Sequence, residues 1–171
     1  ARRDRYMAEL GLPKHDASAL AAEYALACYF EEAVALAGAD RAKPVANWML
    51  GDLAANLNAE SIDVAEARVT PAMLAELVGL IEDGAISGKQ AKEVFAEAAA
   101  TGDAPGAIVE ARGMRQVSDT AEIEAVVQRV LDANLDEVAT YRGGKTGLLG
   151  FFVGQVMREM RGQGNPAVVN E

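Results

Sequence analysis

Apolar residues along this chain recur with the spacing of α-helices almost from end to end. In the most regular stretch they fall at i, i+3, i+4, i+7 and i+11, which places them on one helical face: Leu149, Phe152, Val153, Val156 and Met160. We predict that this face packs in a core. Nowhere do apolar and polar residues alternate with a period of two, as they would in a half-exposed strand. The pattern therefore predicts an all-α protein.

The same pattern predicts a helical bundle domain over residues 1–112. Helices are expected over residues 2–10, 16–37, 44–58, 71–83, 88–101 and 105–112. Asp16 or Ser18 is expected to cap the second of these helices. Thr70-Pro71 and Ser87 are strong helix starts, because a capping hydroxyl precedes the first turn and proline suits its first position.

A second, smaller domain is predicted over residues 113–171. Gly113 is typical of a helix end, and the residues that follow it lack helical periodicity. Asp119 with Glu122 forms a capping-box pattern that starts a new helix. Three helices are expected over about residues 120–133, 135–142 and 149–160, and a further helix begins at Asn165-Pro166. A tail domain of about 59 residues buries little surface and is marginally stable.

Composition supports helices and gives the two domains different charge. Hydrophobic residues make up 51% of the chain and aromatic residues only 5%; alanine, the best helix former, dominates. The net charge of −10 argues against indiscriminate binding of nucleic acid, although it allows a local basic site. Residues 1–112 hold 10 basic and 18 acidic residues, whereas residues 113–171 hold 6 and 8.

One stretch of the tail domain, residues 139–164, is basic. Its charged residues are Arg142, Lys145, Arg158, Arg161 and a single acid, Glu159, which gives a net charge of +3. Glycines at 143 and 144 open a turn around the first two cations, and the other two are expected on the exposed side of the helix. We call these four cations the basic edge and predict that they contact RNA. The alternative is that they only solvate the surface.

Several kinds of chemistry are excluded or disfavoured. Gly144-Lys145-Thr146 is similar to the end of a phosphate-binding P-loop, but that loop needs a glycine where Ala139 stands. The single His15 and the single Cys28 allow no histidine-based triad, multi-histidine metal site or intrachain disulfide. We predict no catalytic residue and no metal site. No apolar run reaches the roughly 18 residues that span a bilayer, and the start lacks a signal peptide. We expect a fragment of a longer cytoplasmic protein.

Five motifs in order cover most of the chain. They are RYMAELGLPKHDA (5–17), ANWMLGDLAANLN (46–58), LIEDGAISGKQAKEVF (80–95), IVEARGMRQVSD (108–119) and YRGGKTGLLGFFVGQVMREMRGQGNPAVVNE (141–171). With these motifs the chain resembles the C-terminal half of the GatB family, the GatB subunits of the aspartyl/glutamyl-tRNA amidotransferases. It departs from the family pattern in lacking the last residues after Glu171 and in carrying His15 where many members have an aromatic residue.

The resemblance implies a helical domain and a YqeY-like tail domain that together grip and select tRNA. It also implies a parent complex, an ATP-dependent carbon–nitrogen ligase with amidotransferase subunits A and C, that uses glutamine to convert Glu-tRNA(Gln) or Asp-tRNA(Asn) to the amide. ATP and Mg²⁺ are expected in an N-terminal cradle outside this sequence, so the fragment itself is expected to hold no cofactor and to be non-catalytic. The other interpretation is a structural helical module that docks protein partners, and the resemblance favours tRNA binding.

Overall fold

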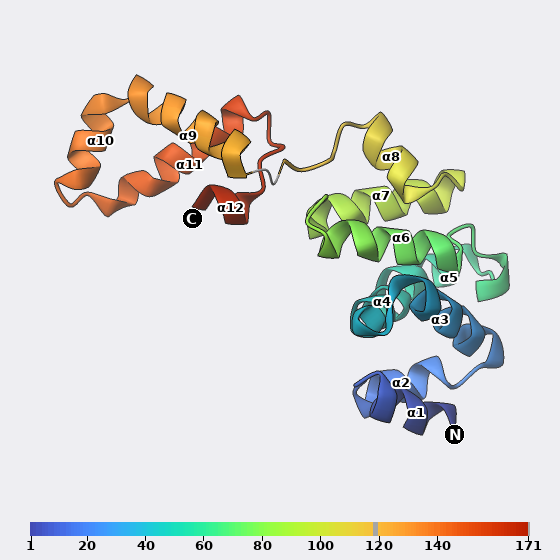
Figure 1. The fold of residues 1–171 in the computed structure, drawn as a ribbon. Coiled ribbons are helices and arrows are strands. Elements are labelled where there is room, and N and C mark those ends of the chain that lie inside the picture. The colour runs from blue at the N-terminus through green and yellow to red at the C-terminus, as the bar shows by residue number, and fades with distance from the viewer. Residues whose placement is uncertain (118–119, 171) are drawn as a thin grey trace. The chain divides into compact units, whose positions relative to one another are not determined.

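The computed structural model describes residues 1–117 and 120–170, and over these residues it contains helices but no β-strand. The predicted all-α class is confirmed. The chain forms two compact units, Ala1–Gly113 and Met114–Glu171 (Figure 1). The predicted capping box at Asp119 lies outside the described residues. None of the described helices is long and apolar enough to cross a membrane.

The first unit is a bundle in which α3 packs along α6. Its helices are α1 (Arg2–Glu9), α2 (Lys14–Leu20), α3 (Tyr24–Ala37), η1 (Ala39–Arg41), α4 (Ala42–Trp48), η2 (Met49–Leu53), α5 (Ala54–Glu60), η3 (Val64–Glu66), α6 (Pro71–Glu82), α7 (Gly88–Thr101) and α8 (Pro105–Ala111). Phe30 of α3 and Leu74 and Val78 of α6 are fully buried. The Tyr29 hydroxyl donates a hydrogen bond to the carbonyl oxygen of Val69 at 2.7 Å, which satisfies a buried polar group beside this core.

Two predicted helix starts are confirmed. The Thr70 hydroxyl accepts a hydrogen bond from the backbone N–H of Met73 at 3.2 Å, and Pro71 takes the first position of α6. At the start of α7, the Ser87 hydroxyl accepts from the Gln90 N–H at 3.2 Å while the Gln90 side chain accepts from the Ser87 N–H at 2.9 Å. These bonds satisfy backbone donors that the helix itself leaves unpaired.

The predicted helix over residues 16–37 is wrong, because the chain breaks between α2 and α3. α2 begins at Lys14 immediately after Pro13, and neither of the two predicted capping side chains caps a helix. The break lets α2 lie against α1, where Leu20 is fully buried, while Tyr24 at the start of α3 is 74% exposed. Packing of the α1–α2 pair thus outweighs the helix propensity of the alanines at 21 and 22.

The predicted helix over residues 44–58 forms, but its middle has π-helical geometry. α4, the π segment η2 and α5 follow one another without a gap. Met49 and Leu53, which bound the π segment, are both buried. Trp48 is half-buried and packs on Phe95 of α7 with 5.6 Å between ring centroids. The wider turn therefore keeps two apolar side chains on the core side of one long helix.

The second unit is built from α9 (Thr120–Ala133), α10 (Leu135–Arg142), η4 (Thr146–Leu148), α11 (Leu149–Glu159) and α12 (Pro166–Asn170). Its buried core is small and comes from α9, α11 and the residue after α11: Ile123, Val126, Val130, Phe152, Val156 and Met160. The N–H of Val117 donates to the carbonyl of Gln163 at 2.6 Å, and the N–H of Asn165 donates to the carbonyl of Val117 at 3.0 Å. This parallel pairing ties the start of the unit to the turn after α11.

Candidate nucleic-acid interface

The four cations of the basic edge lie at the two ends of α11. Arg142 is the last residue of α10 and Lys145 immediately precedes η4, whereas Arg158 lies in the last turn of α11. All are exposed. At 1.5 Å per residue, α11 separates the Arg142–Lys145 pair from the pair at its other end by roughly 16 Å. The structure thus presents two pairs of cations rather than one continuous row.

Arg161 does not lie on a helix, contrary to the prediction. α11 ends at Glu159, and Arg161 follows in the turn with a φ of 54°, next to Gly162 with a φ of 76°. A left-handed backbone is natural for glycine but is strained for arginine, by about 1 kcal/mol or more. The turn therefore holds an exposed guanidinium at a position where glycine would be more stable.

The basic edge has little acidic compensation from its own chain. Over residues 1–117 and 120–170, the side chains of Arg142, Lys145 and Arg161 form no salt bridge or hydrogen bond. Arg158 reaches only the neutral Gln155, with 3.5 Å between Nη1 and Oε1. The nearby acid, Glu159, pairs instead with Arg129 of α9 at 3.5 Å. These four positive charges are thus available to an external anion.

The exposed face of η4 and α11 between the two pairs carries three glycines. Gly147, Gly150 and Gly154 are exposed, and a Cβ atom added at any of them would meet nothing within 4 Å. Packing inside the chain therefore does not require glycine there, although a glycine inside a helix costs about 1 kcal/mol relative to alanine. The face leaves the helix backbone open to close approach by another molecule.

The turn that carries Lys145 depends on glycine. Gly144 has a φ of 105°, which an L side chain rarely adopts, and the Lys145 N–H donates back to the Thr140 carbonyl at 3.3 Å. The residues before this turn belong to α10, so the strand that normally precedes a P-loop is replaced by a helix. The structure agrees with the sequence in excluding a P-loop at Gly144-Lys145-Thr146.

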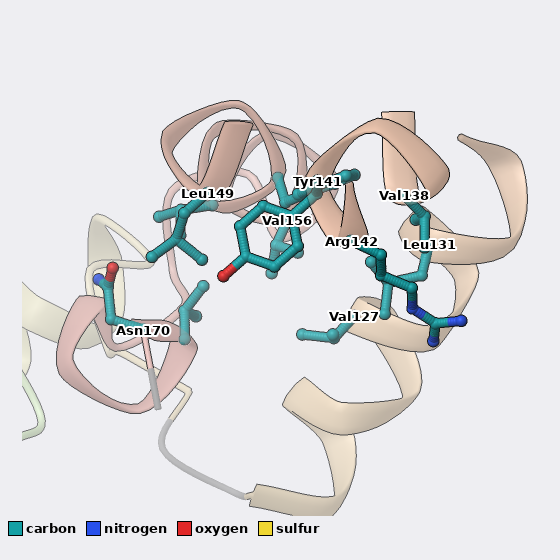
Figure 2. Close-up of a pocket in the computed structure, with 11 residues that line it drawn as sticks. Val127, Leu131, Val138, Tyr141, Arg142, Leu149, Val156 and Asn170 are labelled. Carbon is teal, nitrogen blue, oxygen red and sulfur yellow. The ribbon is translucent and has the colours of Figure 1, made fainter. Parts of the chain in front are cut away.

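An apolar groove of about 320 Å³ opens beside Arg142 (Figure 2), and we call it the tail groove. It is lined by Val127, Leu131, Val138, Tyr141, Arg142, Leu149, Phe152, Val153, Val156, Val169 and Asn170. Leu149 is 45% exposed and Val153 is half-buried, so the prediction that the whole apolar face of this helix is core is wrong at its first residue. Phe152, Val156 and Met160 are buried as predicted.

The tail groove was not predicted from the sequence. Its signal is that α10 contains Val138 and Tyr141 three residues apart, as a core helix would, yet buries no residue completely. The Tyr141 ring packs edge-on against Phe152 with 6.1 Å between centroids. Arg142 therefore belongs both to the basic edge and to the lining of an apolar groove.

The shifted pKa values of the first unit have structural causes. Burial raises the pKa of Tyr6 to about 12, and the Glu31 carboxylate, which accepts a hydrogen bond from this hydroxyl at 2.9 Å, adds to the effect. Hydrogen bonding and charge from the Arg3 guanidinium lower the pKa of Asp4. Glu31 also accepts from Arg2 at 3.2 Å and from Arg5, so it joins α1 to α3. Among the described residues, no three of His, Cys, Asp or Glu gather as metal ligands.

Known proteins resemble this chain along its whole length. The family described as the GatB domain (GatB_Yqey) matches residues 28–171. The corresponding subunit of the aspartyl/glutamyl-tRNA(Asn/Gln) amidotransferase of Geobacter sp. (strain M21) is 54% identical over 172 residues, which cover 100% of this chain and 36% of the relative. The proteins of the same name from Geotalea daltonii and Acidiphilium cryptum are 53% and 52% identical and cover 100% of this chain, which in turn spans 35% and 34% of them. The chain thus spans about a third of the length of these relatives.

Proposed function

Because the chain belongs to the GatB family, we propose that it is the C-terminal part of the GatB subunit of a tRNA-dependent amidotransferase and that it binds tRNA through the basic edge. The observation that carries this proposal is the set of exposed cations without acidic partners at the two ends of α11. They stand out in a chain with a net charge of −10.

The geometry suits contacts to a folded RNA backbone. Arg142 and Lys145 lie at one end of α11 and Arg158 and Arg161 at the other, so each pair can neutralise a separate phosphate or group of phosphates. The glycine face between them lets the RNA backbone approach the helix closely. Such contacts position an RNA by its shape and carry no base sequence.

We place the chemistry of the complex outside this chain. The proposed reaction is the ATP- and glutamine-dependent amidation of Glu-tRNA(Gln) or Asp-tRNA(Asn) in the cytoplasm, with subunits A and C as partners. Its ATP and Mg²⁺ would bind in the remaining two thirds of the GatB subunit. The residues described here contribute RNA binding, and the chain alone is expected to turn over neither ATP nor glutamine.

A salt titration of tRNA binding tests the role of the basic edge. With the complete GatB subunit in its complex, Lys145→Ala/Arg158→Ala should reduce the slope of log affinity against log salt by about 1.5 to 2, because two phosphate contacts are lost. The variant should fold normally, since exposed charges contribute little to stability. Lys14→Ala/Lys89→Ala removes two exposed lysines of the first unit and serves as the matched control.

The two outcomes separate the candidate functions. A reduced slope for the tail variant and an unchanged slope for the control would support RNA binding at the basic edge. An unchanged affinity and slope for the tail variant, with normal folding, would contradict the proposal. The module would then serve to dock protein partners.

A further inference from the structure

The tail groove has the form of a small binding site. It is concave, has a volume of about 320 Å³ and is lined mainly by aliphatic side chains from α9, α10, α11 and α12. Three polar side chains interrupt that lining, Tyr141 and Arg142 from α10 and Asn170 from α12. An apolar cavity of this size with a few convergent polar groups is the usual form of a site for a small organic group.

The polar groups of the groove are free to bind. Figure 2 shows the Tyr141 ring between Leu149 and Val127, with its hydroxyl facing the open centre. That hydroxyl and the Arg142 guanidinium form no hydrogen bond within the described part of the chain. Asn170 donates its amide N–H to the Pro166 carbonyl at 2.6 Å, which leaves its side-chain oxygen as an acceptor. The groove therefore offers a donor-acceptor hydroxyl, a cation and an amide oxygen around an apolar floor.

We propose that the tail groove takes one unstacked nucleobase of the bound RNA, while Arg142 holds the adjoining phosphate. This inference rests on the proposed function, because Arg142 is shared between the groove and the basic edge. The base would pack against the apolar floor and the Tyr141 ring, and its polar edge would meet the Tyr141 hydroxyl and the Asn170 side chain. None of the described residues that line the groove is acidic, so a polyanion can approach it.

The size and lining of the groove favour a base over a protein helix. A docked helix presents several turns of apolar side chains and needs a long groove, whereas 320 Å³ accommodates one compact group. A helix would also leave the Tyr141 hydroxyl without a partner, and an unpaired buried polar group is unfavourable. Because a paired base cannot leave its stack without losing its partner, the proposed nucleotide comes from a loop, a bulge or a strand end.

Filling the groove tests the proposal without changing any charge. Leu149 lines the opening and is 45% exposed, so Leu149→Trp should occupy the space that the base needs. We expect the affinity of the complete complex for intact tRNA to fall by roughly tenfold, which is the loss of one base stack. The slope against salt should stay as in the parent, because the phosphate contacts remain. Leu135→Trp is the matched control, since Leu135 is 68% exposed on α10 and lies outside the groove.

Cross-linking gives a second measurement that does not depend on a variant. RNA in which 4-thiouridine replaces uridine should cross-link on irradiation to the peptide that contains Tyr141 or to the one that contains Val153. Unchanged tRNA affinity in a folded Leu149→Trp variant, or cross-links confined to other peptides, would overturn the base site. Lys145→Ala/Arg158→Ala would still report on the basic edge, so the two proposals fail separately. A photoreactive residue at 149 that cross-links to another protein of the complex would also overturn the base site and identify the groove as a protein contact.

Discussion

Replacing Gly154 by alanine should stabilise the second unit and weaken its contact with RNA. Gly154 lies in the middle of α11, is exposed, and a Cβ atom there would meet nothing within 4 Å. The substitution therefore adds no clash. It removes the conformational freedom that glycine gives to the unfolded chain and should contribute about 1 kcal/mol to the free energy of unfolding. For a unit of this size, such a gain corresponds to a rise of roughly 4–8 °C in Tm.

Thermal unfolding followed by circular dichroism at 222 nm measures the first effect, and tRNA binding measures the second. Gly144→Ala is the control, because its φ of 105° makes alanine strained, so this variant should lower Tm. An unchanged or lower Tm for Gly154→Ala would show that the glycine is needed inside the chain and would refute the reasoning from open space. A higher Tm with unchanged tRNA affinity would show that the RNA does not approach this face of α11.

Two further predictions concern the boundary between the units and the buried tyrosine of α1. Trypsin should cut first after Arg112 or Arg115, and early cleavage at Arg68 or Lys89 would contradict the predicted domain boundary at residues 112 and 113. The raised pKa of Tyr6 keeps its phenol protonated in the folded state after the unfolded chain has lost that proton. Stability should therefore be unaffected by this group below about pH 10 and should fall as pH rises from about 10 to about 12. Urea unfolding at about pH 8 and pH 11 should show a smaller fall for Tyr6→Phe, and an equal fall would rule out this origin.

Local signals in the sequence were enough for most helices of the first unit. Thr70-Pro71 and Ser87 fix the starts of α6 and α7 through bonds that depend only on neighbouring residues. The break between α2 and α3 could not be predicted in this way, because it depends on the packing of α1 against α2. The π segment at Met49–Leu53 could not be predicted either, because its apolar pattern is the same as that of an α-helix.

The candidate site was predicted as a set of residues but not as a geometry. Charge contrast alone selected Arg142, Lys145, Arg158 and Arg161, and their contact with RNA stays a prediction. Periodicity placed Arg161 on the helix, whereas a left-handed backbone ends the regular structure two residues earlier. The tail groove was missed because Leu149 and Val153 satisfy a core pattern even where no other element covers them.

The π segment between α4 and α5 has a consequence for how this chain can change length. A π turn holds more residues than an α turn, so η2 stores surplus backbone inside a helix that is otherwise regular. Gly51 lies within it, is exposed and has nothing near its missing Cβ. A one-residue deletion at this position can be absorbed by tightening the turn, whereas the same deletion in an ordinary helix rotates everything downstream by about 100°. The register of α5 on the bundle can therefore survive an insertion or deletion at this place in evolution.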